Sequence, residues 1–125
     1  CGDTTSAVSN IALAEGVDLV FSGHEHNYMR THPLAGSVES PRVVDTDGDI
    51  TAGAGTVFTV VGNGGHNPRT VGAKTPLWAV ANGTNSPGGF AFGFGEVTVA
   101  GDVLTYRHVS AGGAPLADTF TITRR

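Results

Sequence analysis

A helical segment, one glycine and a short apolar strand open the chain and limit the folds available to it. Residues 4–15 combine alanines and aliphatic side chains with Thr and Ser at their start, the residue types that cap helices. Gly16 follows where a helix commonly ends in a left-handed residue, and residues 17–21 (Val-Asp-Leu-Val-Phe) predict a buried strand. This is half of an α/β unit. Because a buried strand needs parallel neighbours, we expect those from sequence outside these 125 residues.

The remainder of the chain has the pattern of a β-rich region. Residues 22–55 hold Pro33, Pro41 and an acidic stretch, which predicts a long loop with a short hairpin around residues 47–48. Residues 56–61 predict a strand that ends in a Gly-Asn-Gly-Gly turn, and residues 66–89 predict irregular structure. From residue 90 onward, alternating side chains and glycine turns predict an antiparallel meander. The expected fold class is α/β, mostly β after residue 55.

Charge and composition argue against several classes of function. The net charge is −4 with only 7 Lys and Arg, so there is no basic patch and we expect no nucleic-acid partner. A run of about 20 apolar residues is absent, so we expect no membrane span, and no signal-peptide pattern is visible. The single cysteine, Cys1, is either a free thiol or half of a disulfide with another chain or a preceding segment.

The segment Gly23-His24-Glu25-His26-Asn27-Tyr28-Met29-Arg30, directly after the apolar strand, is the candidate site. Ligands of α/β sheets gather just beyond the carboxyl ends of strands. Two histidines at i and i+2 of a regular strand face opposite sides, but in a loop each imidazole can meet one of two ions about 3.5–4 Å apart. Neutral imidazole is a good ligand for zinc or iron. Solvated loop histidines share this spacing, so spacing alone leaves both interpretations open.

Residues 17–30 resemble the last metal-ligand motif of calcineurin-like metallophosphoesterases in its purple acid phosphatase form, a V-D-hydrophobic run followed by G-H-x-H-x-Y-x-R. Residues 56–65, 92–95 and 118–122 resemble later strands of that family, so the resemblance spans nearly the whole chain. It implies the C-terminal part of a four-layer α/β/β/α sandwich. Residues 1–32 would form the helix, strand and metal loop, residues 33–55 a loop insertion, and residues 56–125 a β-rich C-terminal region.

The resemblance also implies a binuclear centre, Fe(III) plus a divalent ion (Zn, Mn or Fe), that hydrolyses phosphate monoesters as acid phosphatases do. His24 would bind the divalent ion and His26 the ferric ion, and a metal-activated water would attack the phosphorus in line. The family's D-x-H, G-D-x-x-Y and G-N-H-[DE] motifs do not occur here. The expected partner is therefore a preceding N-terminal part of the same protein or a separate chain that carries it. The family further implies a secreted or extracytoplasmic protein.

Five other residues are predicted to support or border the site: Asp18, Glu25, Arg30, His32 and His66. Arg30 is expected to order the loop through Asp18 or Glu25. His32 and His66 are candidates for the rim, although the pattern favours a solvated loop histidine over a rim role at each position, and no catalytic residue is assigned.

Three further features have other expected roles. His108 is predicted to be structural. Asp45, Asp47 and Asp49 imitate the start of a calcium loop, but Thr56 stands where the closing glutamate belongs, which favours a solvated acidic hairpin. Asn82-Gly83-Thr84 is a glycosylation sequon whose use the sequence leaves open.

Two alternatives to the monoesterase remain. One is a non-catalytic β-rich binding or interaction module on the same fold. The other is a phosphodiesterase of the same superfamily with different metals. Transition ions that are lost on His24→Ala or His26→Ala would favour an enzyme, and a comparison of monoesters with diesters would separate the two esterases.

Overall fold

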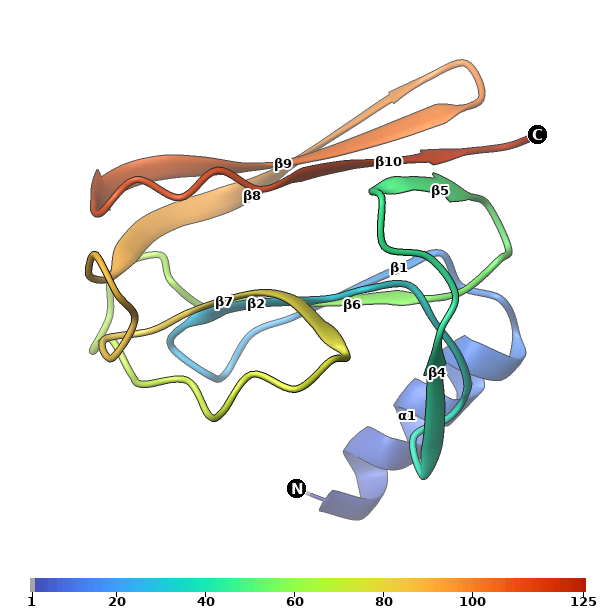
Figure 1. Ribbon diagram of the computed structural model, residues 1–125, viewed down its shortest axis with the longest axis horizontal. Helices are drawn as coiled ribbons and strands as arrows, with labels where there is room; N and C mark the ends of the chain where they lie inside the picture. The colour runs from blue at the N-terminus through green and yellow to red at the C-terminus, as the bar shows by residue number, and fades with distance from the viewer. Residues whose placement is uncertain (1) are drawn as a thin grey trace.

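The computed structural model describes residues 2–125, with side chains from residue 6 onward, so the state of Cys1 lies outside it. The described range contains one helix and ten strands (Figure 1). Their bounds are α1 Gly2–Ala14, β1 Leu19–Ser22, β2 Tyr28–Thr31, β3 Leu34–Ser37, β4 Ser40–Val43, β5 Asp49–Thr51, β6 Val57–Val61, β7 Trp78–Asn82, β8 Ala91–Ala100, β9 Val103–Gly113 and β10 Thr119–Thr123.

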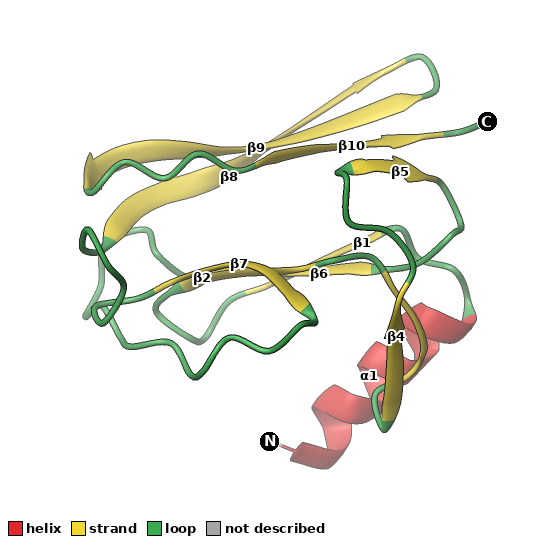
Figure 2. Ribbon diagram, in the orientation of Figure 1, coloured by secondary structure: helices red, strands yellow, loops and turns green. Residues whose placement is uncertain are grey.

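Two four-stranded sheets face each other. One has the order β1-β6-β2-β7 and the other the order β5-β10-β9-β8, while β3 and β4 form a separate two-stranded hairpin. Helix α1 and this hairpin lie on the outer side of the β1-β6-β2-β7 sheet (Figure 2). The described chain therefore supplies one helical layer and two β layers of the expected sandwich.

The hydrophobic core fills the space between the sheets. Both sheets contribute large side chains, because inward and outward positions alternate along each strand. The buried cluster consists of Tyr28 and Val57 from the first sheet and Ile50, Tyr106, Phe120 and Ile122 from the second. Tyr106 stacks on Phe120 with ring centroids 4.9 Å apart. This core fixes the position of β2, which follows the candidate site in sequence.

The first predicted elements are confirmed at the level of type. Helix α1 (Gly2–Ala14) begins two residues before and ends one residue before the predicted 4–15, and Gly16 has a φ of 66°, the left-handed value expected of a residue that ends a helix. Strands β6, β8, β9 and β10 match the predicted strand at 56–61 and the predicted antiparallel meander. Within residues 2–125, no helix is long and apolar enough to cross a membrane.

Strand β1 differs from its prediction as a buried strand. It pairs in parallel with β6 and forms one edge of its sheet. Phe21 is 49% exposed, and Val17, just before the strand, is 40% exposed. Residues 17–21 were correctly predicted to form a strand. The edge of β1 that faces away from β6, and the side chain of Phe21, could be buried only by a neighbour that the described residues do not supply.

The prediction of a long loop over residues 22–55 is wrong from Tyr28 onward, where β2 begins. Residues 33–55 contain β3, β4 and β5, and β4 pairs with β3 instead of forming a hairpin with residue 50. Strand β5 instead joins the second sheet by parallel pairing with β10. Within residues 66–89, predicted to be irregular, only Trp78–Asn82 (β7) forms a strand. These strands are three to five residues long, too short to show a hydrophobic period, and distant partners stabilise them.

Candidate functional site

The two histidines of the motif lie on a tight loop between β1 and β2. His24 is exposed and has a left-handed backbone, with a φ of 73°. Such a conformation is uncommon for a residue with a side chain and concentrates at functional sites. The loop follows the carboxyl end of a parallel strand, the predicted location for a ligand site.

Gly62, at the end of β6, lets this loop approach the neighbouring strand. A Cβ atom at this position would overlap the backbone carbonyl oxygen of Glu25. The amide of Gly62 also donates a hydrogen bond of 3.0 Å to the carbonyl oxygen of Asn27. The glycine of the predicted turn is therefore required where the chain packs against the histidine loop.

The imidazole of His26 is oriented by a backbone carbonyl. Its Nδ1 lies 3.0 Å from the carbonyl oxygen of Asn67, and because a carbonyl only accepts, Nδ1 carries the proton. This tautomer leaves Nε2 with a free lone pair. Metal-binding histidines commonly have this arrangement, in which the second ring nitrogen donates to a carbonyl or carboxylate. The ring of His66 packs edge-on against that of His26, with centroids 5.2 Å apart.

The donor chemistry fits part of a transition-metal site. Imidazoles bind zinc and iron, and the free Nε2 of His26 and the exposed His24 are such donors. However, the part of the chain that the structure describes holds no group of three or more His, Cys, Asp or Glu side chains placed to bind one ion. Further ligands would have to come from elsewhere.

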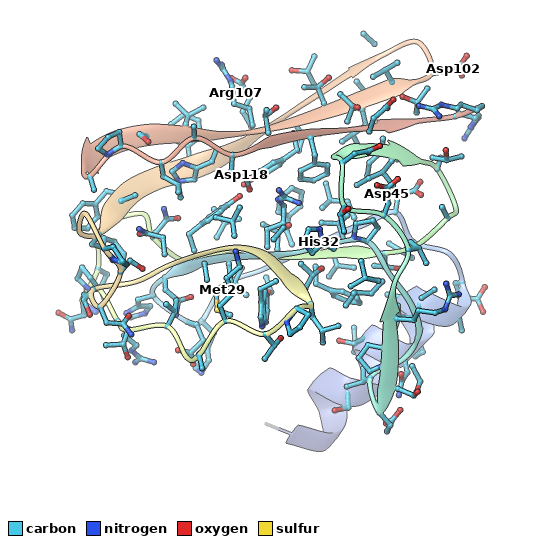
Figure 3. All side chains as sticks on the ribbon, in the orientation of Figure 1. Met29, His32, Asp45, Asp102, Arg107 and Asp118 are labelled. Carbon is cyan, nitrogen blue, oxygen red and sulfur yellow. The ribbon has the colours of Figure 1, made fainter. Side chains whose placement is uncertain are left out.

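Tyr28 and Arg30, which complete the motif, point into the space between the sheets. Arg30 donates from Nε to Asp118 Oδ2 (2.8 Å) and from its terminal nitrogen to Asp118 Oδ1 (2.7 Å). The hydroxyl of Tyr28 hydrogen-bonds to the same carboxylate at 2.6 Å and to the Tyr106 hydroxyl at 3.0 Å. Figure 3 shows Asp118 between the layers and Arg107 on the outer face of the second sheet.

Burial raises the pKa of both tyrosines. Two effects raise the pKa of Tyr28 far above its usual value: desolvation is the larger, and the hydrogen bond to Asp118 is the next. Desolvation also raises the pKa of Tyr106. Both hydroxyls therefore stay protonated to a higher pH than in an unfolded chain and serve as hydrogen-bonding groups of the core.

His108 has a structural position, as predicted. It is buried, its Nδ1 lies 3.2 Å from the Leu116 carbonyl oxygen, and its Nε2 lies 2.9 Å from Asn63 Nδ2. Asn63 also donates to the carbonyl oxygen of Ala91 at 2.9 Å. The Gly-Asn-Gly-Gly turn beside the histidine loop is thus anchored to the second sheet.

The remaining predicted residues divide into two groups. Glu25 and His66 lie at the histidine loop, where Glu25 forms a 3.6 Å ion pair with Arg69 and His66 contacts His26. Asp18 and His32 do not border it. Asp18 precedes β1, at the opposite end from the loop, and accepts a 2.6 Å hydrogen bond from the Gly53 amide.

His32 follows β2, again at the far end from the loop, and there desolvation, then Arg30 and Lys74, lower its pKa. The expected pairing of Arg30 with Asp18 or Glu25 is also wrong, because Arg30 pairs with Asp118.

The acidic stretch at residues 45–49 forms its own turns. The Asp47 amide donates to Asp45 Oδ1 at 2.9 Å, and the Asp49 amide donates to Asp47 Oδ1 at 2.8 Å. The hydrogen bond from the Asp47 backbone is the main cause that lowers the pKa of Asp45. These backbone bonds fix the side chains of Asp45 and Asp47 in turns within the stretch itself.

Sequence reasoning missed four residues that shape the site or its support: Asn63, Asn67, Arg69 and Asp118. Asp118 had one detectable signal, because an arginine within an apolar strand requires a buried carboxylate partner. The other three depend on contacts between segments far apart in sequence, and no local pattern marks them.

Comparison with known proteins gives consistent results. No protein-family model matches the chain. "Probable inactive purple acid phosphatase 24" of Arabidopsis thaliana is 31% identical over 111 residues, which are 86% of this chain and 16% of that protein. "Nucleotide pyrophosphatase/phosphodiesterase" of Hordeum vulgare is 30% identical over 111 residues, 86% of this chain and 27% of that protein.

A solved structure shares the fold. Purple acid phosphatase PPD1 from yellow lupin (Lupinus luteus) seeds superposes with a TM-score of 0.71 and 23% identity, covering 94% of this chain and 19% of that chain. The chain thus spans well under a third of each relative's length.

Fold and relatives together support the metallophosphoesterase superfamily for this chain. The chain is similar in sequence to proteins named as purple acid phosphatases and shares the fold of the C-terminal part of one, the similarity that the motif predicted.

Proposed function

We propose that this chain supplies His24 and His26 to a binuclear metal centre that hydrolyses phosphate monoesters. The observation that carries the proposal is the hydrogen bond from His26 Nδ1 to the Asn67 carbonyl, since it leaves Nε2 free to bind an ion at the carboxyl end of β1. Following the family pattern, His24 would hold a divalent ion (Zn, Mn or Fe) and His26 would hold Fe(III). Such ions polarise the phosphate ester and activate the nucleophile.

The partner in this proposal is a preceding part of the same protein, or a separate chain, that completes the ligand set. The described residues provide no group of three ligands, and β1 has room for a parallel neighbour at its free edge. Residues 1–125 alone are therefore expected to bind metal weakly and to hydrolyse nothing. The family also suggests export from the cytoplasm, which detection of the protein outside the cell would test.

Metal analysis of the assembled protein tests the ligand assignment. We expect two transition ions per molecule in the unaltered protein and loss of metal in His24→Ala and in His26→Ala. His32→Ala is the matched control, because His32 lies at the far end of β2 and its variant should keep both ions. A metal-free unaltered protein, or full metal content in both loop variants, would overturn the proposal.

Two relatives' names favour alternatives that the same preparation can separate. The Arabidopsis protein is named as probably inactive, which suits a non-catalytic module. The barley protein is named as a nucleotide pyrophosphatase and phosphodiesterase, which suits diester cleavage. Turnover of a monoester but not of a diester by the metal-containing protein would support the monoesterase.

A further inference from the structure

Residues 66–71 form a segment that crosses the histidine loop and bonds to it at three points. The Asn67 carbonyl lies 3.0 Å from His26 Nδ1, and the Arg69 amide donates to the His26 carbonyl at 2.9 Å. Asn27 Nδ2 donates to the Thr70 carbonyl at 3.0 Å. These three bonds couple the position of the segment to that of the predicted metal ligand.

The opposite side of the segment is fixed as well. The Val71 amide donates to Asn85 Oδ1 and Asn85 Nδ2 donates to the Val71 carbonyl, each at 2.9 Å. The Thr84 amide donates to the Arg69 carbonyl at 3.0 Å. The backbone around Arg69 is therefore hydrogen-bonded on both sides, which holds the Cα of Arg69 in place beside the histidine loop.

The guanidinium of Arg69 is available to an anion. It lies 3.6 Å from Glu25, the residue between His24 and His26, and both charged side chains are 51% exposed. An ion pair that is this long and this exposed to solvent contributes little, so an anionic ligand can displace Glu25. Arginine binds carboxylates and phosphates with two parallel hydrogen bonds. In a chain with a net charge of −4, this places a cation at the rim of the predicted metal site.

We infer that Arg69 determines specificity by binding a second anionic group of the substrate, beyond the phosphate held at the histidine loop. The preferred substrates are then phosphate esters that carry a further phosphate or carboxylate. The inference rests on the proposed metal-dependent function of the same loop. It assigns Arg69 to the second anionic group because the Arg69 side chain is half exposed and pairs with Glu25 beside the two histidines, while, among the described side chains, neither imidazole bonds to it.

Binding of non-hydrolysable phosphonates tests the inference without turnover. In the metal-containing assembled protein, the affinities of phenylphosphonate and of its 3- and 4-carboxy derivatives are measured by calorimetry. We expect Arg69→Gln to weaken binding of at least one carboxy derivative about tenfold and to leave phenylphosphonate unchanged. Arg42→Gln is the matched control, since Arg42 is an exposed arginine on β4, outside the histidine loop.

The outcomes separate the two proposals. A protein that holds no metal and binds none of the phosphonates contradicts the proposed function itself. A metal-containing protein in which Arg69→Gln changes no affinity, or changes all of them equally, contradicts the role of Arg69 alone. Metal content of Arg69→Gln should equal that of the unaltered protein, because Arg69 is not a ligand.

Discussion

Arg30 and Asp118, 88 residues apart in the chain, form a two-point ion pair in the space between the sheets. Arg30 is 8% exposed and Asp118 is 7% exposed. Tyr28 bonds to the same carboxylate, so the Tyr and Arg of the motif hold β2 against the second sheet. The motif therefore has two parts. His24 is exposed to solvent and His26 is partly exposed, whereas Tyr28 and Arg30 are buried and stabilise the packing of the two sheets.

Removal of the Asp118 charge should destabilise the protein strongly. In Asp118→Asn, Arg30 stays buried without a compensating charge, which costs about 3–5 kcal/mol. Glu96→Gln is the control, since Glu96 pairs with Arg107 at the same 2.7 Å separation but in solvent, where a pair contributes about 0–1 kcal/mol. Denaturant unfolding of the assembled protein measures the free energy of unfolding of both variants. An equal loss of stability in the two variants would contradict the structural role of Asp118.

Stability should fall at alkaline pH because of the two buried tyrosines. Burial raises the pKa of Tyr28 and of Tyr106 above the value of about 10 found in unfolded chains. The folded state then holds these protons more tightly than the unfolded state. Their contribution is complete below about pH 10 and is lost as the pH rises further.

Melting temperatures between about pH 9 and 11 test this behaviour. The fall above pH 10 should be less steep in Tyr106→Phe, which lacks one titrating hydroxyl. Identical slopes for the variant and the unaltered protein would show that Tyr106 titrates normally.

Gly62→Ala should weaken metal binding in the assembled protein. The added methyl group would overlap the Glu25 carbonyl and displace the histidine loop, so we expect an affinity about 10–100-fold lower, as for other changes that misorient ligands. Gly64→Ala is the control, since a Cβ there meets no atom within 4 Å. Metal titration of both variants measures this effect. Equal metal affinities for Gly62→Ala and Gly64→Ala would contradict the close approach of the histidine loop to Gly62.

The sequon at Asn82 should remain unmodified. Asn82 is 7% exposed, its Nδ2 donates to the Gly89 carbonyl (3.0 Å), and its Oδ1 accepts from the Ala91 amide (2.8 Å). Peptide mapping after expression in a glycosylating host should find no sugar there. A sequon built into the exposed turn by Gly101→Asn with Val103→Thr is the positive control. A glycan on Asn82 in folded protein would contradict its buried position.

Local patterns predicted the elements that depend on local physics. The helix before Gly16, the strand β6 and the β8–β10 meander follow from capping residues, apolar runs and period-2 alternation. The position of the histidine loop followed from a strand that ends just before Gly23. The resemblance to purple acid phosphatases was confirmed at the level of fold and of sequence relatives.

Contacts between distant segments could not be predicted in this way. Strand β5 has three residues and exists because it pairs with β10 in a register that joins Asp49 to Thr121. The partner of Arg30 was assigned to nearby carboxylates, whereas the core selects Asp118 across the sandwich. The hydrogen bond that fixes the tautomer of His26 likewise comes from Asn67. These three contacts depend on how distant segments pack together in the folded protein, and no local sequence pattern predicts that packing.

The open edge of β1 has a consequence for handling the protein. Within residues 2–125 no strand pairs with the outer edge of β1, which lies beside the exposed ring of Phe21, so one copy offers another a surface for strand pairing. Residues 1–125 produced alone should self-associate through this edge. A charged residue in place of Phe21 should reduce aggregation without touching either histidine.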